Sequence, residues 1–180
     1  PGLIVCSISG YGQTGPMRSE PGHDLTYQAV AGGLSLGERM DGIPPVPGML
    51  VADVAGGALT ACMRICAALV ARGRTGLGSW LDVSMAEGAL ALNAPMVAAS
   101  DLVGVNPAPG GELLTGGAAQ YRVYRCKDGK CIAFAPLEPK FWSAFCEALG
   151  TAVEAEVGQL ADLFAQRNRD EWVELLRDAC

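Results

Sequence analysis

Hydrophobic and polar residues follow one another along the first half of the chain in blocks typical of a parallel α/β layer. Residues 3–8 form a continuous apolar run, which predicts a strand buried on both faces. Residues 54–72 are apolar nearly all round and predict a long buried helix. Residues 80–83 predict a second strand, and the pattern predicts one helix from Ser84 to about Leu102. The order strand, helix, strand, helix predicts a βαβ layer.

The second half of the chain has the pattern of an antiparallel hairpin with helices. Residues 121–126 and 130–134 flank Lys127-Asp128-Gly129, which is a hairpin turn signal, and two amphipathic helices follow. We therefore expect two parts. Residues 1–111 are expected to be part of a large α/β domain, and residues 112–180 the start of a smaller α+β domain.

Composition excludes some classes of protein. The chain has 180 residues, 50% of them hydrophobic, and a formal net charge of −6. It shows no basic run of the kind that binds nucleic-acid phosphates. Asp53 and Arg64 interrupt the apolar residues 50–71, and an Arg near a bilayer centre costs about 2.5–3.5 kcal/mol, so we expect no membrane span. We expect a cytoplasmic protein with its seven cysteines reduced and no zinc site.

Both ends of the sequence suggest an internal piece of a longer protein. The chain starts at Pro1 without Met and enters a predicted strand almost at once. It stops at Cys180 within a helical pattern. We therefore expect missing parts on both sides.

Glycines follow the first predicted strand, but not at the spacing of a dinucleotide-binding loop. Gly10 and Gly12 are followed by Gly15-Pro16, so the third glycine is missing from its position. Pro16 also interrupts the helix that such a loop should open. We expect a loop at the end of the strand that lines a cleft.

One carboxylate, Asp53, lies where the long apolar helix is expected to begin. A buried acid is costly unless something pairs with it or uses it. The first helical turn offers free N–H groups, and Gly56 and Gly57 leave room for a close approach, which suits an anion or a developing oxyanion. The alternative is an ordinary capping Asp on a buried helix.

His23, the only histidine, lies at a predicted loop-to-helix corner, where a functional or a structural role fits.

Nine short motifs occur in the order found in one known family and cover nearly the whole chain. They lie at residues 9–16, 22–24, 50–57, 74–78, 82–88, 116–117, 121–124, 128–129 and 138–141. With them the chain resembles the alpha-methylacyl-CoA racemases, within the larger group of family III CoA transferases of the formyl-CoA transferase and carnitine CoA-transferase type.

The resemblance implies an architecture. The large domain would be a doubly wound parallel, Rossmann-like sheet, followed by a smaller α+β domain, in subunits that form an interlocked homodimer. It also implies that this chain lacks the N-terminal part of the large domain, where much of the CoA-binding surface lies in this family.

The resemblance also assigns roles to residues. In the racemases, a histidine and an aspartate that match His23 and Asp53 act as two acid/bases, and a glutamate that matches Glu138 supports the histidine. In the transferases the aspartate is a nucleophile and another residue, often Tyr, replaces the histidine. His23 and Glu138 therefore favour the racemase. The residues implied to bind the substrate or CoA are Gly22, Asp24, Leu25, Thr26 and Tyr27.

The leading functional hypothesis is a racemase or epimerase. It would interconvert the 2R and 2S forms of 2-methyl-branched acyl-CoA thioesters by removing and returning the α-proton through an enolate. The alternatives are a family III CoA transferase with Asp53 as covalent nucleophile, and an inactive CoA-binding fragment. The expected partners are an acyl-CoA substrate and a second copy of the chain, without nucleic acid, membrane, metal or another cofactor.

Overall fold

The computed structural model describes residues 1–37 and 41–177. The chain divides into two units, Pro1–Pro107 and Ala108–Cys180, and each is described by itself below. The predicted division between residues 111 and 112 lies shortly after this one. Residues 35–48 are rich in Gly and Pro, which predicts a surface loop, and residues 38–40 of this stretch lie outside the described residues.

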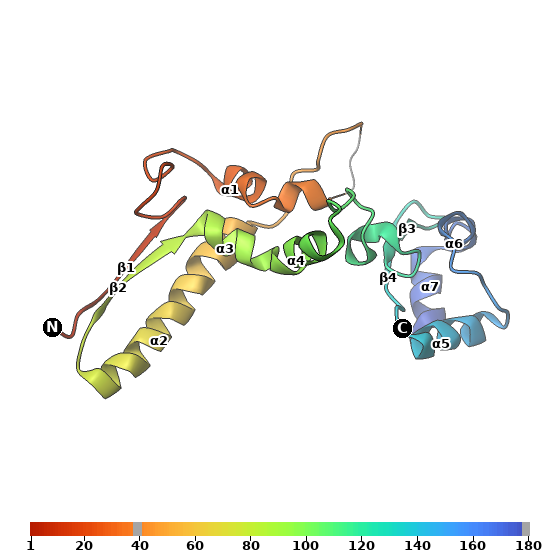
Figure 1. Ribbon diagram of the computed structural model, residues 1–180. Helices are drawn as coiled ribbons and strands as arrows, with labels where there is room; N and C mark the ends of the chain where they lie inside the picture. Colours follow the sequence, from red (N-terminus) through yellow and green to blue (C-terminus); the bar gives the residue numbers. More distant parts are fainter. Residues whose placement is uncertain (38–40, 178–180) are drawn as a thin grey trace. The chain divides into compact units, whose positions relative to one another are not determined.

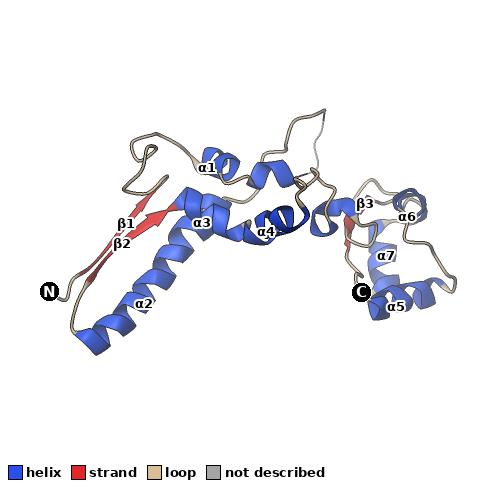
Figure 2. Ribbon diagram, in the orientation of Figure 1, coloured by secondary structure: helices blue, strands red, loops and turns tan. Residues whose placement is uncertain are grey.

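A parallel pair of strands forms the sheet of the first unit. β1 (Ile4–Ser9) pairs with β2 (Ser79–Ser84) along its whole length, with Ile4 opposite Ser79. Figure 2 shows both strands of this pair in red. The predicted parallel α/β arrangement is therefore confirmed. The connection from β1 to β2 contains α1 (Asp24–Val30), the 3-10 helix η1 (Gly33–Leu36), the π-helix η2 (Val51–Leu59) and α2 (Thr60–Thr75).

The strand and the long helix that were predicted to be buried are largely open in this chain. Val5 and Ile8 of β1 are exposed, and so are Met63 and Val70 of α2. Helix α2 lies alongside the strand pair, which covers only part of its apolar surface (Figure 1). The prediction of burial is therefore wrong for this chain, because apolar residues all round a helix need neighbours that the described residues do not supply.

The continuous helix from Val51 to Thr75 is long and apolar enough to cross a membrane by length and composition, with a mean hydropathy of 1.8 in its most apolar window. Core helices of soluble proteins pass the same test. The absence of a membrane span therefore stays a prediction from Asp53 and Arg64.

The helix predicted from Ser84 onward is two helices. The Ser84 hydroxyl accepts a hydrogen bond from the Glu87 N–H at 3.2 Å, which confirms the predicted start. Helix α3 runs over Met85–Leu92 and α4 over Ala94–Val103. Pro95 lies in the first turn of α4, where it has no N–H to continue the hydrogen bonds of α3, and this explains the break.

Small residues bring the helices of the first unit close together. Its buried cluster consists of Tyr27, Ala31, Ala52, Ala86 and Ala89. Where η2 crosses α3, a Cβ placed on Gly88 would overlap the backbone of Gly56. This crossing fixes the middle of η2 against the middle of α3.

The second unit is built around the predicted hairpin and an aromatic core. β3 (Arg122–Arg125) pairs antiparallel with β4 (Cys131–Phe134), as predicted. The helical segments are the π-helix η3 (Leu113–Gly117), α5 (Pro139–Leu149), α6 (Val157–Phe164) and α7 (Arg169–Leu176). The fully or nearly fully buried aromatic side chains are Tyr124, Phe134, Phe145, Phe164 and Trp172.

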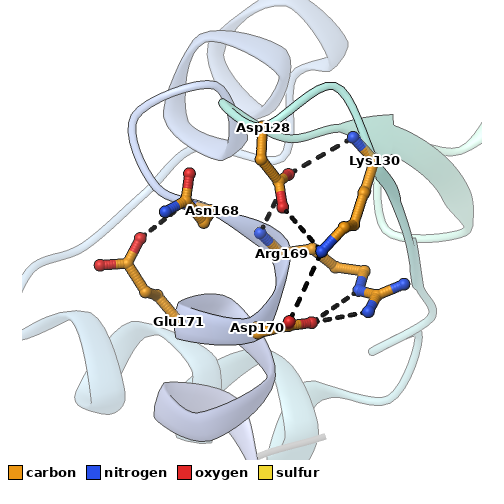
Figure 3. Close-up of polar contacts among 6 residues, drawn as sticks. All are labelled: Asp128, Lys130, Asn168, Arg169, Asp170 and Glu171. Atoms are coloured by element: carbon orange, nitrogen blue, oxygen red, sulfur yellow. Dashed lines mark hydrogen bonds and ion pairs between the residues drawn. The ribbon is translucent and has the colours of Figure 1, made fainter.

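Polar contacts hold the hairpin turn against the start of α7 (Figure 3). Asp128 accepts a hydrogen bond from the Arg169 backbone N–H at 3.3 Å. The Lys130 ammonium lies 3.3 Å from the Asp128 carboxylate and 3.6 Å from that of Asp170. The hydrogen bond from the Arg169 side chain lowers the pKa of Asp170. The pKa of Asp128 is also lowered, because hydrogen bonds from Arg169 and Lys130 outweigh the opposing effect of desolvation.

Candidate active site

His23 lies at the predicted loop-to-helix corner, as the N-cap residue of α1. Its carbonyl oxygen accepts hydrogen bonds from the N–H groups of Thr26 and Tyr27, at 2.9 and 3.1 Å. The Thr26 hydroxyl accepts a hydrogen bond from the His23 N–H at 3.0 Å. These contacts fix the backbone of the turn while the side chains of His23 and Leu25 remain exposed.

Asp53 lies one turn further into its helix than predicted. The N-cap of η2 is Leu50, and Asp53 is in the first turn, so Asp53 is not the capping residue. The backbone N–H of Asp53 donates to Asp24 Oδ1 at 2.9 Å, and that of Val54 donates to the Leu50 carbonyl at 3.0 Å. These two N–H groups are occupied, so they are not free donors for an oxyanion.

Asp24, next to His23, joins the two candidate catalytic segments. Its side chain is buried at 7% exposure, and its second oxygen accepts a hydrogen bond from Gln28 Nε2. Gln28 is also buried, and its amide donates to the Met49 carbonyl at 3.3 Å. The turn at His23 and the start of η2 are therefore tied together through α1.

Tyr27 packs against the turn and the glycine-rich loop. Its ring lies edge-on to Tyr11 at 5.1 Å between centroids, and a Cβ on Gly10 or Gly22 would overlap it. Burial raises the pKa of Tyr27, and the nearby Tyr11 and Asp53 raise it further. The phenol therefore keeps its proton at neutral pH.

Gly56 and Gly57 do not leave room for a ligand. Both are buried, and the close approach that they allow is to α3. A Cβ on Gly56 would lie 2.6 Å from the Met85 carbonyl oxygen, and one on Gly57 would lie 2.8 Å from Met85 Cγ. The prediction that they admit an anion is therefore wrong, because a helix occupies the space.

The loop after β1 is fixed by a residue that the sequence analysis did not single out. Both oxygens of Asp82, on β2, accept hydrogen bonds from the Gln13 N–H, at 2.9 and 3.2 Å. The loop borders a hollow of about 270 Å³ that it shares with α1 and α3, lined by Tyr11, Met17, Val30, Glu87 and Leu90 among others. No period or spacing in the sequence marks this contact, because its partners are 69 residues apart.

Glu138 belongs to the second unit, as the exposed N-cap residue of α5. Its carbonyl oxygen accepts hydrogen bonds from the N–H groups of Phe141 and Trp142, but its side chain makes no capping hydrogen bond. The Glu138 side chain therefore does not cap α5, although a carboxylate at the start of a helix often does. Its proposed partnership with His23 stays a prediction.

Metal-binding side chains and thiols are the remaining candidate groups of the chain. Across residues 1–37 and 41–177, no group of three or more His, Cys, Asp or Glu side chains is arranged to hold a metal ion. The described cysteines are free thiols, and Cys180 lies outside the described residues.

Comparison with known proteins gives consistent matches over the whole chain. The model of CoA-transferase family III matches residues 1–180. The chain is 34% identical to "Alpha-methylacyl-CoA racemase" of Homo sapiens, over all of this chain and 51% of that protein. It is 35% identical to "Succinyl-CoA:glutarate CoA-transferase" of Mus musculus, over 83% of this chain and 34% of that protein.

A solved structure shares the fold. A CAIB/BAIF family protein from Brucella suis has a TM-score of 0.78 and 25% identity, and the match covers 98% of this chain and 51% of that one. The chain thus spans about half the length of the relatives and structures that it matches most fully. The family match over the whole sequence, together with this fold, shows that the chain belongs to CoA-transferase family III.

Proposed function

We propose that the protein is a racemase or epimerase of 2-methyl-branched acyl-CoA thioesters that works as an interlocked homodimer. The observation that supports this most directly is the hydrogen bond from the Asp53 N–H to Asp24, which joins the His23 turn to the first turn of η2. Relatives named for alpha-methylacyl-CoA racemase activity match the whole chain. The coenzyme A group enters as part of the substrate, and no other cofactor is proposed.

The proposed chemistry needs one group on each face of the α-carbon. The α-proton of a thioester is weakly acidic, so a base that titrates near neutral pH, such as histidine, suits its removal. The electron pair of the broken C–H bond moves into the enolate. A second group, on the opposite face, then donates a proton to the α-carbon and inverts it. We assign these two roles to His23 and Asp53, and the role of supporting the histidine to Glu138.

The second candidate is a CoA transferase, which the match to a succinyl-CoA:glutarate CoA-transferase favours. In that reaction the Asp53 carboxylate would attack the thioester carbonyl, release the CoA thiolate and hold the acyl group as a mixed anhydride. His23 would then have no necessary part in the reaction.

One experiment separates the two candidates. The full-length protein is incubated with a single enantiomer of a 2-methylacyl-CoA, with and without hydroxylamine. A racemase gives the opposite enantiomer and leaves Asp53 unmodified. A hydroxamate on Asp53, with no inversion of the α-carbon, would instead show acyl transfer and contradict the racemase proposal.

A further inference from the structure

Asp24 is a buried carboxylate with no place in the proposed proton transfers. At 7% exposure it would be costly to bury unless both oxygens were partnered. One oxygen accepts the Asp53 N–H at 2.9 Å, and the other accepts the Gln28 amide. Both oxygens are engaged within the protein, which does not suit a residue that binds substrate.

The hydrogen bond from Asp53 replaces a missing cap. The N-cap of η2 is Leu50, whose side chain has no oxygen to accept an N–H of the first turn. Asp24, 29 residues earlier in the sequence, supplies that oxygen from another helix. A local cap would only stabilise the helix, but this one also sets the position of η2 relative to α1.

Gln28 adds a second point of attachment. Its amide donates both to Asp24 Oδ2 and to the carbonyl of Met49, which lies just before η2. The chain reaches Met49 through a segment rich in Pro and Gly, at residues 42–48, which has no helix or strand to orient it. The Asp24–Gln28 pair therefore holds the first turn of η2, which contains Asp53, to α1.

We propose that Asp24 is a positioning residue that fixes Asp53 relative to His23 and so sets how often proton removal leads to inversion. This inference rests on the proposed racemase function. Asp24 acts through the backbone of Asp53, without touching the substrate. When it is lost, the His23 face still removes and returns protons, while delivery of a proton by Asp53 to the opposite face fails.

The test follows each enantiomer of a 2-methylacyl-CoA in deuterium oxide with the full-length protein. Two quantities are measured for each: inversion, and deuterium in the recovered, uninverted substrate. For Asp24→Ala we expect inversion to fall about 10²-fold, because a misplacement of a catalytic group by about 1 Å costs about 10²-fold in rate. Deuterium exchange into the enantiomer whose α-proton His23 removes should stay within about threefold of the wild-type rate, because the backbone of His23 is held by other contacts. Asp24→Asn keeps an acceptor oxygen, so its rate of inversion should lie between those of wild type and Asp24→Ala. The KM should not change, because no substrate contact is lost.

Glu20→Gln is the matched control. It removes one exposed carboxylate from the same loop, three residues before His23, and should change neither quantity. Equal loss of inversion and exchange in the Asp24 variants would overturn the proposal, and so would a raised KM alone. The first result would show that Asp24 is a purely structural residue, and the second that it binds substrate.

A direct readout does not depend on racemase activity. Hydrogen exchange of the Asp53 amide should be fast in Asp24→Ala and slow in wild type and Asp24→Asn.

If wild type forms a hydroxamate instead of inverting its substrate, the racemase proposal fails. Positioning by Asp24 is then tested by hydroxamate yield, which should fall in Asp24→Ala at unchanged KM. An unchanged yield with unchanged amide exchange would reject it.

Discussion

His23 and Asp53 both stand at the start of a helix, but their backbones are held in different ways. The backbone of His23 is fixed within its own turn by Thr26 and Tyr27. That of Asp53 is held from outside its helix by Asp24. The two candidate acid/bases are therefore held by different contacts. Replacing the side chain of one should leave the backbone contacts of the other in place.

Replacing either candidate acid/base should stop racemisation. His23→Ala and Asp53→Ala each remove the group on one face of the α-carbon, so inversion should fall below detection in a chiral assay of the full-length protein. Each variant should still exchange the α-proton of one enantiomer with deuterium, and the two variants should keep opposite enantiomers. Near wild-type racemisation by Asp53→Ala would refute the two-base scheme.

Glu138 should matter to turnover more than to stability. Glu138→Gln keeps the shape of the side chain and loses its charge, and no capping hydrogen bond is lost with it. In the full-length protein we expect turnover to fall about 10²-fold, the size of lost acid/base support, with the melting temperature unchanged. Glu147→Gln, an exposed change on the same helix, is the control. Unchanged turnover in Glu138→Gln would leave His23 without its proposed partner.

At the scale of the helices, η2 and α3 can pack closely enough to position the candidate site because the residues at their contact are glycines. Gly56 and Gly88 meet backbone to backbone, so a single methyl group at either residue has no space. Such contacts are sensitive, because the obstructing atoms belong to the backbone and cannot rotate away.

Gly88→Ala should destabilise the first unit. The added Cβ overlaps the Gly56 backbone, and overpacking of this kind costs about 1–3 kcal/mol. Urea unfolding followed by fluorescence of Trp80, in the same unit, measures the change. Gly73→Ala, in α2, is the control: no atom lies within 4 Å of its Cβ, and we expect it to stabilise by up to about 1 kcal/mol. Equal stability of the two variants would mean that the helices separate freely.

Acid should weaken the attachment of the hairpin turn to α7. The pKa values of Asp128 and Asp170 are lowered below the ordinary value of 3.8, so their stabilisation is complete above about pH 4 and is lost as the pH falls through the folded-state values. The urea midpoint of the second unit, followed by Trp172 fluorescence, should therefore fall between pH 4 and pH 2.

Asp128→Asn should remove part of this pH dependence, since the amide carries no charge to lose. Asp162→Asn, an exposed change on α6, should leave the pH dependence as in wild type. If both variants follow the wild-type curve, the contacts of Figure 3 contribute nothing measurable to stability.

For the whole molecule, the notable property is the amount of exposed apolar surface. Leu3 just before β1, Val5 on β1, Trp80 on β2 and Met63 on α2 are exposed, although the sequence around them is that of a core. Surfaces of this kind on a soluble protein usually mark places where other protein is bound. The strand pair also has edges that invite further strands.

The 180-residue chain expressed alone should therefore self-associate. Sedimentation velocity at rising concentration should show dimers or larger species, and charged substitutions at Met63 and Val70 should reduce their share. A monodisperse monomer at all concentrations would count against the interlocked arrangement. It would also show that the exposed helix α2 is tolerated in water.

The sequence by itself determined the family, the parallel order of the first unit, the hairpin and the corner at His23. These features depend on local patterns and on motif order, which a sequence carries directly. Only the tertiary structure decided that Gly56 serves a helix crossing and that Asp24 caps η2 from 29 residues away. A hydrogen bond between separate helices leaves no period or spacing in the sequence, because the partner is chosen by how the chain folds back.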